Sequence, residues 1–169
     1  PAAFYTLALE TGMRKAQLCG LKWLDVDFEA GKLRVIRQLV APGPKPEFGP
    51  TKNGAPRTID ISPAIVALLK THKSRQAEMK LKNRRQYHDH ELVFAKEWGD
   101  LSRQHDVLGQ PLQMNNLGQR EYARLIEAAQ VRKITFHGLR HTCATLLFQA
   151  GVPVKVIQER LGHKRIEIT

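Results

Sequence analysis

Two strand-like segments flank a loop rich in proline and glycine, and most of the rest of the 169-residue chain has helical spacing. Residues 32–40 alternate and are rich in Val and Ile, residues 41–55 hold four prolines and three glycines, and residues 56–61 have the pattern of a returning strand. Alternation favours strands, whereas proline and glycine favour loops. We therefore expect a chain of the α+β class, mainly α-helical, with one small antiparallel β-sheet.

Apolar residues at helical spacing predict the remaining elements. Residues 1–24 predict a helix, a break at Thr11-Gly12 and a second helix capped by Thr11. Ser62-Pro63 begins another helix, and Asn115 or Asn116 caps one that reaches about residue 129. The last two predicted helices end at Gly151 and Gly162, and the first of them is expected to bury Leu139, Cys143, Leu146, Leu147 and Ala150.

The composition is that of one globular domain. The 42% of apolar residues suffice for a core, and no run is long enough to span a bilayer. No signal segment opens the chain, and Pro1 begins within a helical pattern, so we interpret the chain as a fragment of a longer protein. Cys19 and Cys143 lie far apart, which argues against a zinc ribbon or a disulfide framework and fits a reducing cytoplasm.

The charge favours a polyanionic partner. The chain holds 27 Lys and Arg against 16 Asp and Glu, a net charge of +11. Cations that neutralise phosphates release counterions, so this surplus suits nucleic acid. It equally suits a basic protein that is merely soluble, and charge alone favours nucleic acid only modestly.

His137 and Arg140 are the first candidate site residues. At i and i+3 near a helix start they share a face, opposite the apolar stripe of Leu139 and Leu146, so we expect Arg140 to face outward. A guanidinium there can bind phosphate oxygens in a two-pronged fork. On spacing alone, a solvated face that binds nothing is the favoured interpretation.

Three further cationic residues lie at element ends. Arg14 falls in the first turn of a predicted helix, where free N–H groups attract anions. Lys52 lies in a turn-like Thr-Lys-Asn-Gly segment between the candidate strands, and His163 follows the helix stop at Gly162. Each of the three is also typical of ordinary surface, turn or capping residues.

These pieces, in this order, resemble the catalytic domain of the tyrosine recombinase (phage integrase) family over nearly the whole chain. The stretches that carry the resemblance are TGMRKAQLCGLKWLDVDF, TKNGAPRTIDI, HGLRHTCATLL and LGHKRIEIT. The pair HGLRHT and LGH is very specific, and TGMR with the following LKWLD is moderately so. Gln17 stands where the family usually has an acidic residue, a position that orients neighbouring side chains.

The resemblance implies an enzyme that cuts and rejoins DNA through a covalent 3′-phosphotyrosine, without metal, cofactor or ATP. Residues 1–169 would form its catalytic domain, and the tyrosine nucleophile would lie just beyond Thr169, which would leave this fragment inactive. By resemblance, Arg14 and Arg140 bind the phosphate and Lys52 is the general acid to the leaving oxygen. His137 handles the tyrosine proton, and His163 adds a hydrogen bond. Double-stranded DNA is the implied partner, with a monomeric fragment, a full-length tetramer on DNA and no membrane.

Three alternatives stay open. A metal enzyme would use His137, His141 and His163, although no HExxH motif is present. A non-catalytic DNA-binding module would use residues 152–166 as a helix-turn-helix-like unit. A relaxase similar to type IB topoisomerases would share the chemistry without the site specificity.

Overall fold

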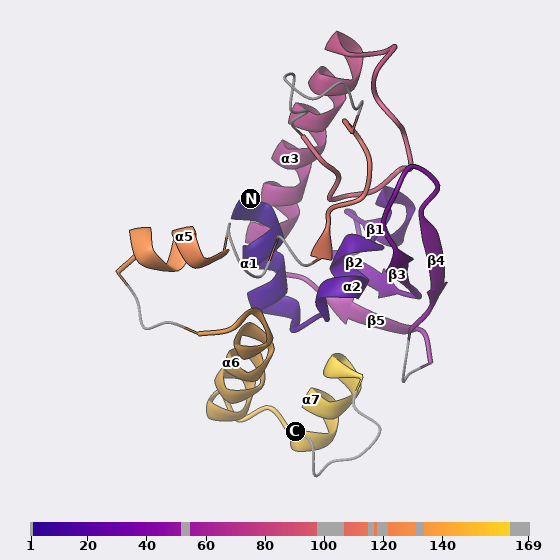
Figure 1. Cartoon of the computed structure of the whole chain (residues 1–169). Coiled ribbons are helices and arrows are strands. Elements are labelled where there is room, and N and C mark those ends of the chain that lie inside the picture. The colour runs from indigo at the N-terminus through magenta and orange to yellow at the C-terminus, as the bar shows by residue number, and fades with distance from the viewer. Residues whose placement is uncertain are drawn as a thin grey trace.

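The computed structural model describes residues 2–51, 55–97, 107–114, 117, 122–130 and 134–162. Helices dominate it, and the short antiparallel strands, which follow α2 along the chain, lie beside α2 to the right of α1 and α3 in Figure 1. The helices are α1 (Ala2–Thr11), α2 (Lys15–Cys19), α3 (Pro63–Lys82), α5 (Tyr122–Ala128), α6 (Phe136–Gln149) and α7 (Val154–Leu161), with a 3₁₀ turn at Trp23–Asp25. This arrangement confirms the mainly helical α+β class.

The strands form two small sheets. β1 (Val26–Asp27), β2 (Lys32–Val35) and β5 (Arg57–Asp60) make a three-stranded sheet in the order β1-β2-β5. β3 (Arg37–Ala41) pairs with β4 (Glu47–Pro50) in a separate hairpin. The expectation that residues 41–55 are all loop was therefore wrong. The first three prolines fall in the turn and Pro50 at a strand end, where a missing N–H group does not disrupt pairing.

Of the predicted helix caps, Ser62 is confirmed and Thr11 is wrong. Ser62 does cap α3, since its hydroxyl accepts a hydrogen bond from the Ile65 N–H at 3.3 Å. Thr11 does not cap α2: it is the last residue of α1, and its hydroxyl donates back to the Leu7 carbonyl at 2.6 Å. Asn115 and Asn116 lie outside the described residues.

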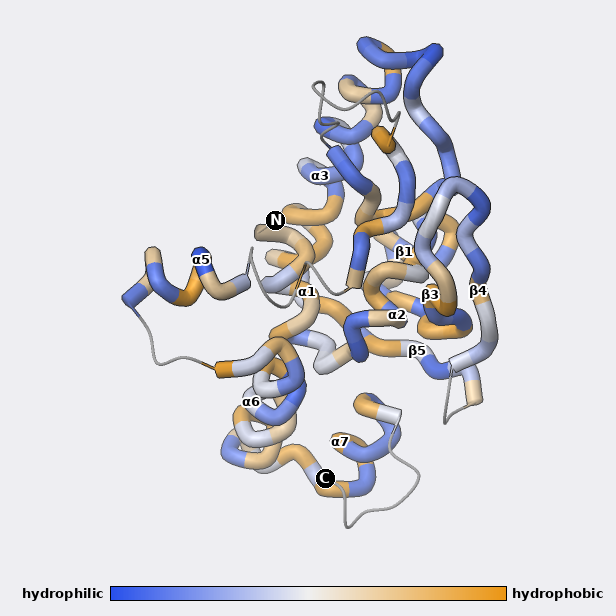
Figure 2. Tube along the Cα trace, viewed as in Figure 1, coloured by the Kyte–Doolittle hydropathy of each residue, from blue (hydrophilic) through white to orange (hydrophobic). Residues whose placement is uncertain are grey.

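Two apolar clusters hold these elements together. The larger one joins α1, α2, α3 and the strands, and its most buried members include Leu7, Leu18, Leu33, Ile59 and Leu69. The smaller one joins α6 to α7 through Cys143, Ala144, Ile157 and Leu161. Along the backbone, α1 is mostly apolar, whereas the far end of α3 is mostly polar (Figure 2). Within the described ranges, no helix combines the length and hydrophobicity that a membrane span needs.

The predicted buried face of α6 is only half right. Leu139 and Cys143 are buried, but Leu146 is 53% exposed and Ala150 is exposed too. α6 packs against α1 and α7, and Leu146 belongs to neither of the two apolar clusters. Periodicity shows which residues share a helical face, but it cannot show how much of that face a neighbouring element covers.

Candidate anion-binding site

A sharp turn between α1 and α2 places Arg14 beside the ends of α6 and α7. Gly12 has a positive φ of 61°, and a Cβ there would lie 2.3 Å from Leu161 Cδ2 and 3.3 Å from Cys143 Sγ. A larger residue would therefore strain the backbone and displace the buried Leu161 side chain. Arg14 follows as the N-cap residue of α2 and is half-buried.

Gln17 fixes the start of α2. Its side-chain oxygen accepts a hydrogen bond from the Arg14 backbone N–H at 3.1 Å, and the residue is only 1% exposed. This contact takes the place of the cap that was expected from Thr11. The position where the resemblance implies an acidic residue thus orients its neighbours here through a neutral amide.

Arg140 points inward, so the expectation that it faces outward was wrong. It is 4% exposed, and its guanidinium donates to the Gly12 carbonyl at 2.6 Å and to the Leu161 carbonyl at 2.7 Å. The side chain is long enough to reach from α6 to the α1–α2 turn and the end of α7. Burial next to two neutral acceptors holds its orientation without cancelling its charge.

Arg57, on β5, is a residue of this site that the sequence did not single out. Its Nε donates to the Arg160 carbonyl at 2.8 Å, and its Nη2 donates to the Gln17 side-chain oxygen at 3.1 Å. The sequence signal that could have identified Arg57 is weak: it is a charged residue at the start of a predicted strand. We call Arg14, Arg57 and Arg140 together the arginine site.

The arginine site has an excess of positive charge. Burial, followed by the charges of Arg14 and Arg57, lowers the pKa of the Arg140 guanidinium to about 9. Burial and then the charge of Arg14 lower the Arg57 pKa to about 10, and burial lowers the Arg14 pKa. These shifts mean that three cations lie within electrostatic range of one another, so an anion between them would be stabilised.

Carboxylates in the described ranges do not neutralise these arginines. The arginines that do form ion pairs there are Arg37, with Asp25, and Arg75, with Glu97. Glu10, at the end of α1, is committed to Ser62, accepting from its backbone N–H at 2.7 Å and its hydroxyl at 2.8 Å. The arginine site therefore has the charge to bind phosphate or another oxyanion.

His137 lies at the edge of this region. It is exposed in the first turn of α6, with its ring centroid 4.9 Å from that of His141 in an edge-on arrangement. The part of the ring that is shielded from water lowers the pKa of His137, and the charges of His141, Arg140 and Arg14 lower it further. The lowered pKa favours a neutral imidazole at pH 7. Among the residues that the structure describes, no third His, Cys, Asp or Glu joins this pair as a metal-binding group.

The other two predicted site residues, Lys52 and His163, lie outside the described residues. Along the chain, Lys52 belongs to the connection between β4 and β5, and His163 directly follows Gly162. Gly162 is left-handed (φ 70°) and ends α7 as predicted. The helix-turn-helix alternative has its first helix in α7, and its second would also fall outside the described residues.

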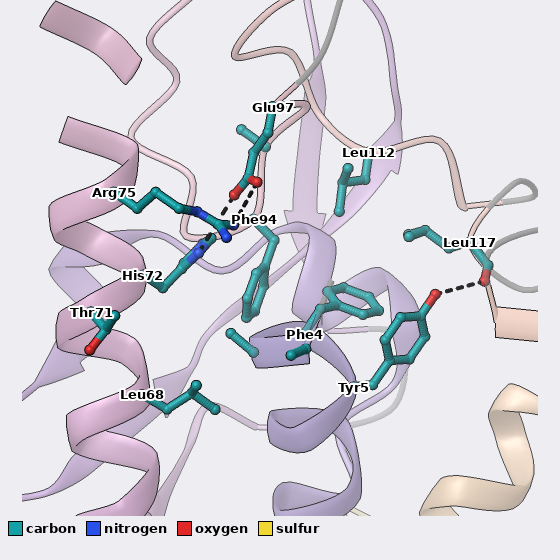
Figure 3. Close-up of a pocket in the computed structure, with 13 residues that line it drawn as sticks. Phe4, Tyr5, Leu68, Thr71, His72, Arg75, Phe94, Glu97, Leu112 and Leu117 are labelled. Atoms are coloured by element: carbon teal, nitrogen blue, oxygen red, sulfur yellow. Dashed lines mark hydrogen bonds and ion pairs between the residues drawn. The ribbon is translucent and has the colours of Figure 1, made fainter. Parts of the chain in front are cut away.

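A pocket of about 170 Å³ lies elsewhere, at the opposite end of α1 (Figure 3). Phe4, Leu68 and Phe94 line its apolar part, and Arg75 and His72 meet Glu97 at one corner. Among the described residues that line the pocket, the charged groups are these paired ones. This pocket shares no residue with the arginine site.

Comparisons with known proteins match the whole chain. A family model described as the phage integrase family matches residues 1–169. The chain is 38% identical over 181 residues to a tyrosine recombinase XerC-like protein of Caldanaerobacter subterraneus subsp. tengcongensis, covering 99% of this chain and 43% of that protein. It is 29% identical over 164 residues to tyrosine recombinase XerA of Pyrococcus furiosus, covering 94% and 44%. It thus spans less than half the length of these curated relatives.

Solved structures show the same fold. The Tn1549 transposon integrase in complex with a circular intermediate DNA superposes with a TM-score of 0.75 at 23% identity, covering 98% of this chain and 51% of that one. The crystal structure of XerA recombinase gives a TM-score of 0.74 at 22% identity, covering 98% and 50%.

Proposed function

Because the chain belongs to the phage integrase family, we propose that it is the catalytic domain of a site-specific tyrosine recombinase acting on double-stranded DNA. The observation that carries this proposal is the arginine site. Neutral acceptors hold the guanidiniums of Arg57 and Arg140, and Arg14 is close enough for its charge to lower the pKa of both, so the site favours an oxyanion such as phosphate.

The proposed reaction exchanges one phosphodiester for another. A tyrosine oxygen attacks the scissile phosphorus, the bond to the 5′-oxygen breaks, and a 3′-phosphotyrosine forms. The bond energy is kept in that ester, so the 5′-hydroxyl can later attack it and release the tyrosine without ATP. Tyr5 and Tyr122 pack with Phe136, and Tyr87 lies under the Lys80 ammonium at the end of α3. None of these contacts involves the arginine site, so the nucleophile would be another tyrosine of the full-length protein.

Arg14 and Arg140 would stabilise the negative charge that develops on the non-bridging oxygens. A preorganised donor of this kind contributes roughly 3–4 kcal/mol to the lowering of the barrier. Lys52 would protonate the leaving 5′-oxygen, and His163 would add a hydrogen bond. His137, whose lowered pKa favours the neutral ring, would accept the tyrosine proton. With these cations in place, the reaction needs no metal ion.

The full-length protein would act as a tetramer on two DNA sites, whereas this chain alone would be a monomer. Several of the solved structures that this chain resembles are described as DNA complexes. They include the Tn1549 transposon integrase with a circular intermediate DNA and a lambda integrase dimer bound to a COC′ core site. The basic net charge of +11 supports a DNA partner.

The test is covalent capture. The full-length protein is incubated with a pool of nicked duplexes of randomised sequence and then denatured in detergent. We expect a protein–DNA adduct that survives denaturation and forms equally well in EDTA. Binding without an adduct would favour the non-catalytic DNA-binding module, and loss of cleavage in EDTA would favour the metal enzyme. Relaxation of supercoiled DNA without sequence preference would favour the topoisomerase-like alternative.

A further inference from the structure

Arg57 connects three elements through one side chain. It projects from β5, donates from Nε to the Arg160 carbonyl of α7 at 2.8 Å, and donates from Nη2 to the Gln17 side chain of α2 at 3.1 Å. The same Gln17 oxygen accepts the Arg14 N–H at 3.1 Å. A change at Arg57 is therefore transmitted both to the end of α7 and to the residue that begins α2.

The link between β5 and α7 runs in both directions. The Arg160 guanidinium donates to the Asp60 carbonyl of β5 at 3.1 Å and to the Glu10 carbonyl of α1 at 3.2 Å. The last carbonyls of a helix lack partners within the helix and carry a partial negative charge. In α7, Arg57 and Arg140 satisfy two of them, at Arg160 and Leu161.

Gly162 lets the Arg57 guanidinium lie close against the end of α7. A Cβ at Gly162 would be 3.0 Å from Arg57 Nη1 and 3.2 Å from its Cζ. The chain turns at this point with a φ of 70° and continues directly into His163. Arg57 is thus packed against the residue from which the His163 segment starts.

We propose that Arg57 is a positioning residue, which ties the C-terminal end of α7 to the start of α2 and so sets the places of Arg14 and Arg140 relative to the phosphate. This inference rests on the proposed function. The contacts of Arg57 support positioning, because its Nε and Nη2 bind acceptors on two different elements, α7 and α2, and so hold these elements together. Lysine would keep the charge but has no planar fork with which to bridge two acceptors.

The first test needs no DNA. Hydrogen exchange is measured for the isolated chain and for Arg57→Lys, with Arg34→Lys as the matched control. Arg34 lies on β2, beside β5, and also donates to a backbone carbonyl, that of Leu24 at 2.9 Å. We expect the amides of the last turn of α7 to exchange about tenfold faster in Arg57→Lys, as loss of a charged hydrogen bond allows, and not in the control. Unchanged exchange at α7 would overturn the proposal.

The second test uses the full-length protein and a duplex recovered by covalent capture. Arg57→Lys is expected to slow adduct formation by about 100-fold, the scale of a misplaced catalytic group, while duplex affinity stays unchanged. Gln17→Glu is expected to speed it about twofold, because a carboxylate accepts more strongly and holds Arg57 more firmly.

If the Arg57 charge acted directly on the phosphate, Gln17→Glu would change the rate of adduct formation in the opposite direction. Gln17→Glu would then neutralise that charge and slow adduct formation, which would overturn the positioning role. If the wild-type protein forms no adduct but the end of α7 still exchanges faster in Arg57→Lys, the recombinase assignment fails. The role of Arg57 in holding α7 to α2 would then still be supported.

Discussion

Two polar clusters of this molecule differ in the charge of their hydrogen-bond donors. In the first, which we call the α3 network, the Trp23 indole donates to the Gln76 side chain at 2.7 Å, and Gln76 donates to the Leu92 and Val93 carbonyls at 3.2 and 3.3 Å. His72 contacts the Val93 carbonyl at 2.7 Å. The second cluster is the arginine site, whose donors carry full charges but whose described acceptors are neutral.

This difference in charge means that the α3 network can stabilise the fold, whereas the arginine site can also bind a ligand. In the α3 network, the Trp23 and Gln76 donors meet neutral acceptors, and the nearby carboxylate of Glu97 is paired with Arg75, so the network fixes α3 against residues 92–93. In the arginine site, the hydrogen bonds orient the guanidiniums while three positive charges stay uncompensated by carboxylates among the described residues. Of the two clusters, only the arginine site leaves a favourable interaction for a phosphate to make.

The largest effect is expected from Arg140→Ala in the full-length protein. Cleavage should fall about 1000-fold, because a preorganised cation is removed from the place where charge develops. Duplex binding should be largely spared, since many other cations contribute to it. Adduct formation and duplex affinity are the measurements, with Arg34→Ala as the control for loss of a surface arginine. Unimpaired cleavage would reject the role of Arg140.

Breaking the α3 network should instead cost stability. Gln76→Leu leaves the Trp23 N–H and the Leu92 carbonyl without their partner, which should lower the free energy of unfolding by about 2 kcal/mol. Urea unfolding of the chain measures this, with Ser74→Ala on the exposed face of α3 as the control.

Adduct formation by full-length Gln76→Leu should match the wild-type rate wherever the variant is folded. A slower rate in the folded variant would show that the two clusters are coupled.

Local rules predicted the ends of α7, from Pro153 and Gly162. For Arg14 and Arg140, local spacing alone favoured ordinary surface residues, and the resemblance to tyrosine recombinases singled them out. The inward direction of Arg140 did not follow, because its acceptors, Gly12 and Leu161, lie far away along the chain.

Arg57 was missed for the same reason. A charged residue at the start of a strand is a weak signal, and the partners that give Arg57 its role come from α2 and α7. Likewise, β4 was missed because the four prolines of residues 41–55 suggest a loop, while its pairing with β3 depends on a register that only the folded hairpin provides. Local patterns thus predict elements, whereas sites assembled from several elements need the tertiary structure.

The α3 network should also make stability depend on pH. Burial lowers the pKa of His72; the Val93 carbonyl and Glu97 oppose this shift, and Arg75 adds to it. The unfolded chain therefore binds a proton first as the pH falls below about 6.5, so stability is full above that pH and is lost toward the lower folded pKa. The slope from this one proton is at most about 1.4 kcal/mol per pH unit.

Urea unfolding between pH 7 and pH 5 measures that slope. His72→Gln should show a shallower one, because the amide does not titrate, while His90 and His137, whose pKa values are also lowered, contribute equally to both proteins. Equal slopes would mean that His72 is not the group responsible.

The smallest expected effect tests the open charge of the arginine site directly. Sulfate should stabilise the isolated chain more than chloride at equal ionic strength, by about 0.8 kcal/mol at roughly three times its dissociation constant. The general salting-out effect of sulfate acts on every variant alike, so the informative quantity is the difference between variants. Arg14→Gln, which removes one cation but none of the described hydrogen bonds of Arg57 and Arg140, should lose this surplus. Gln76→Leu should keep it despite its lower stability, and an equal loss in both variants would mean that the two clusters do not differ in the way their charges suggest.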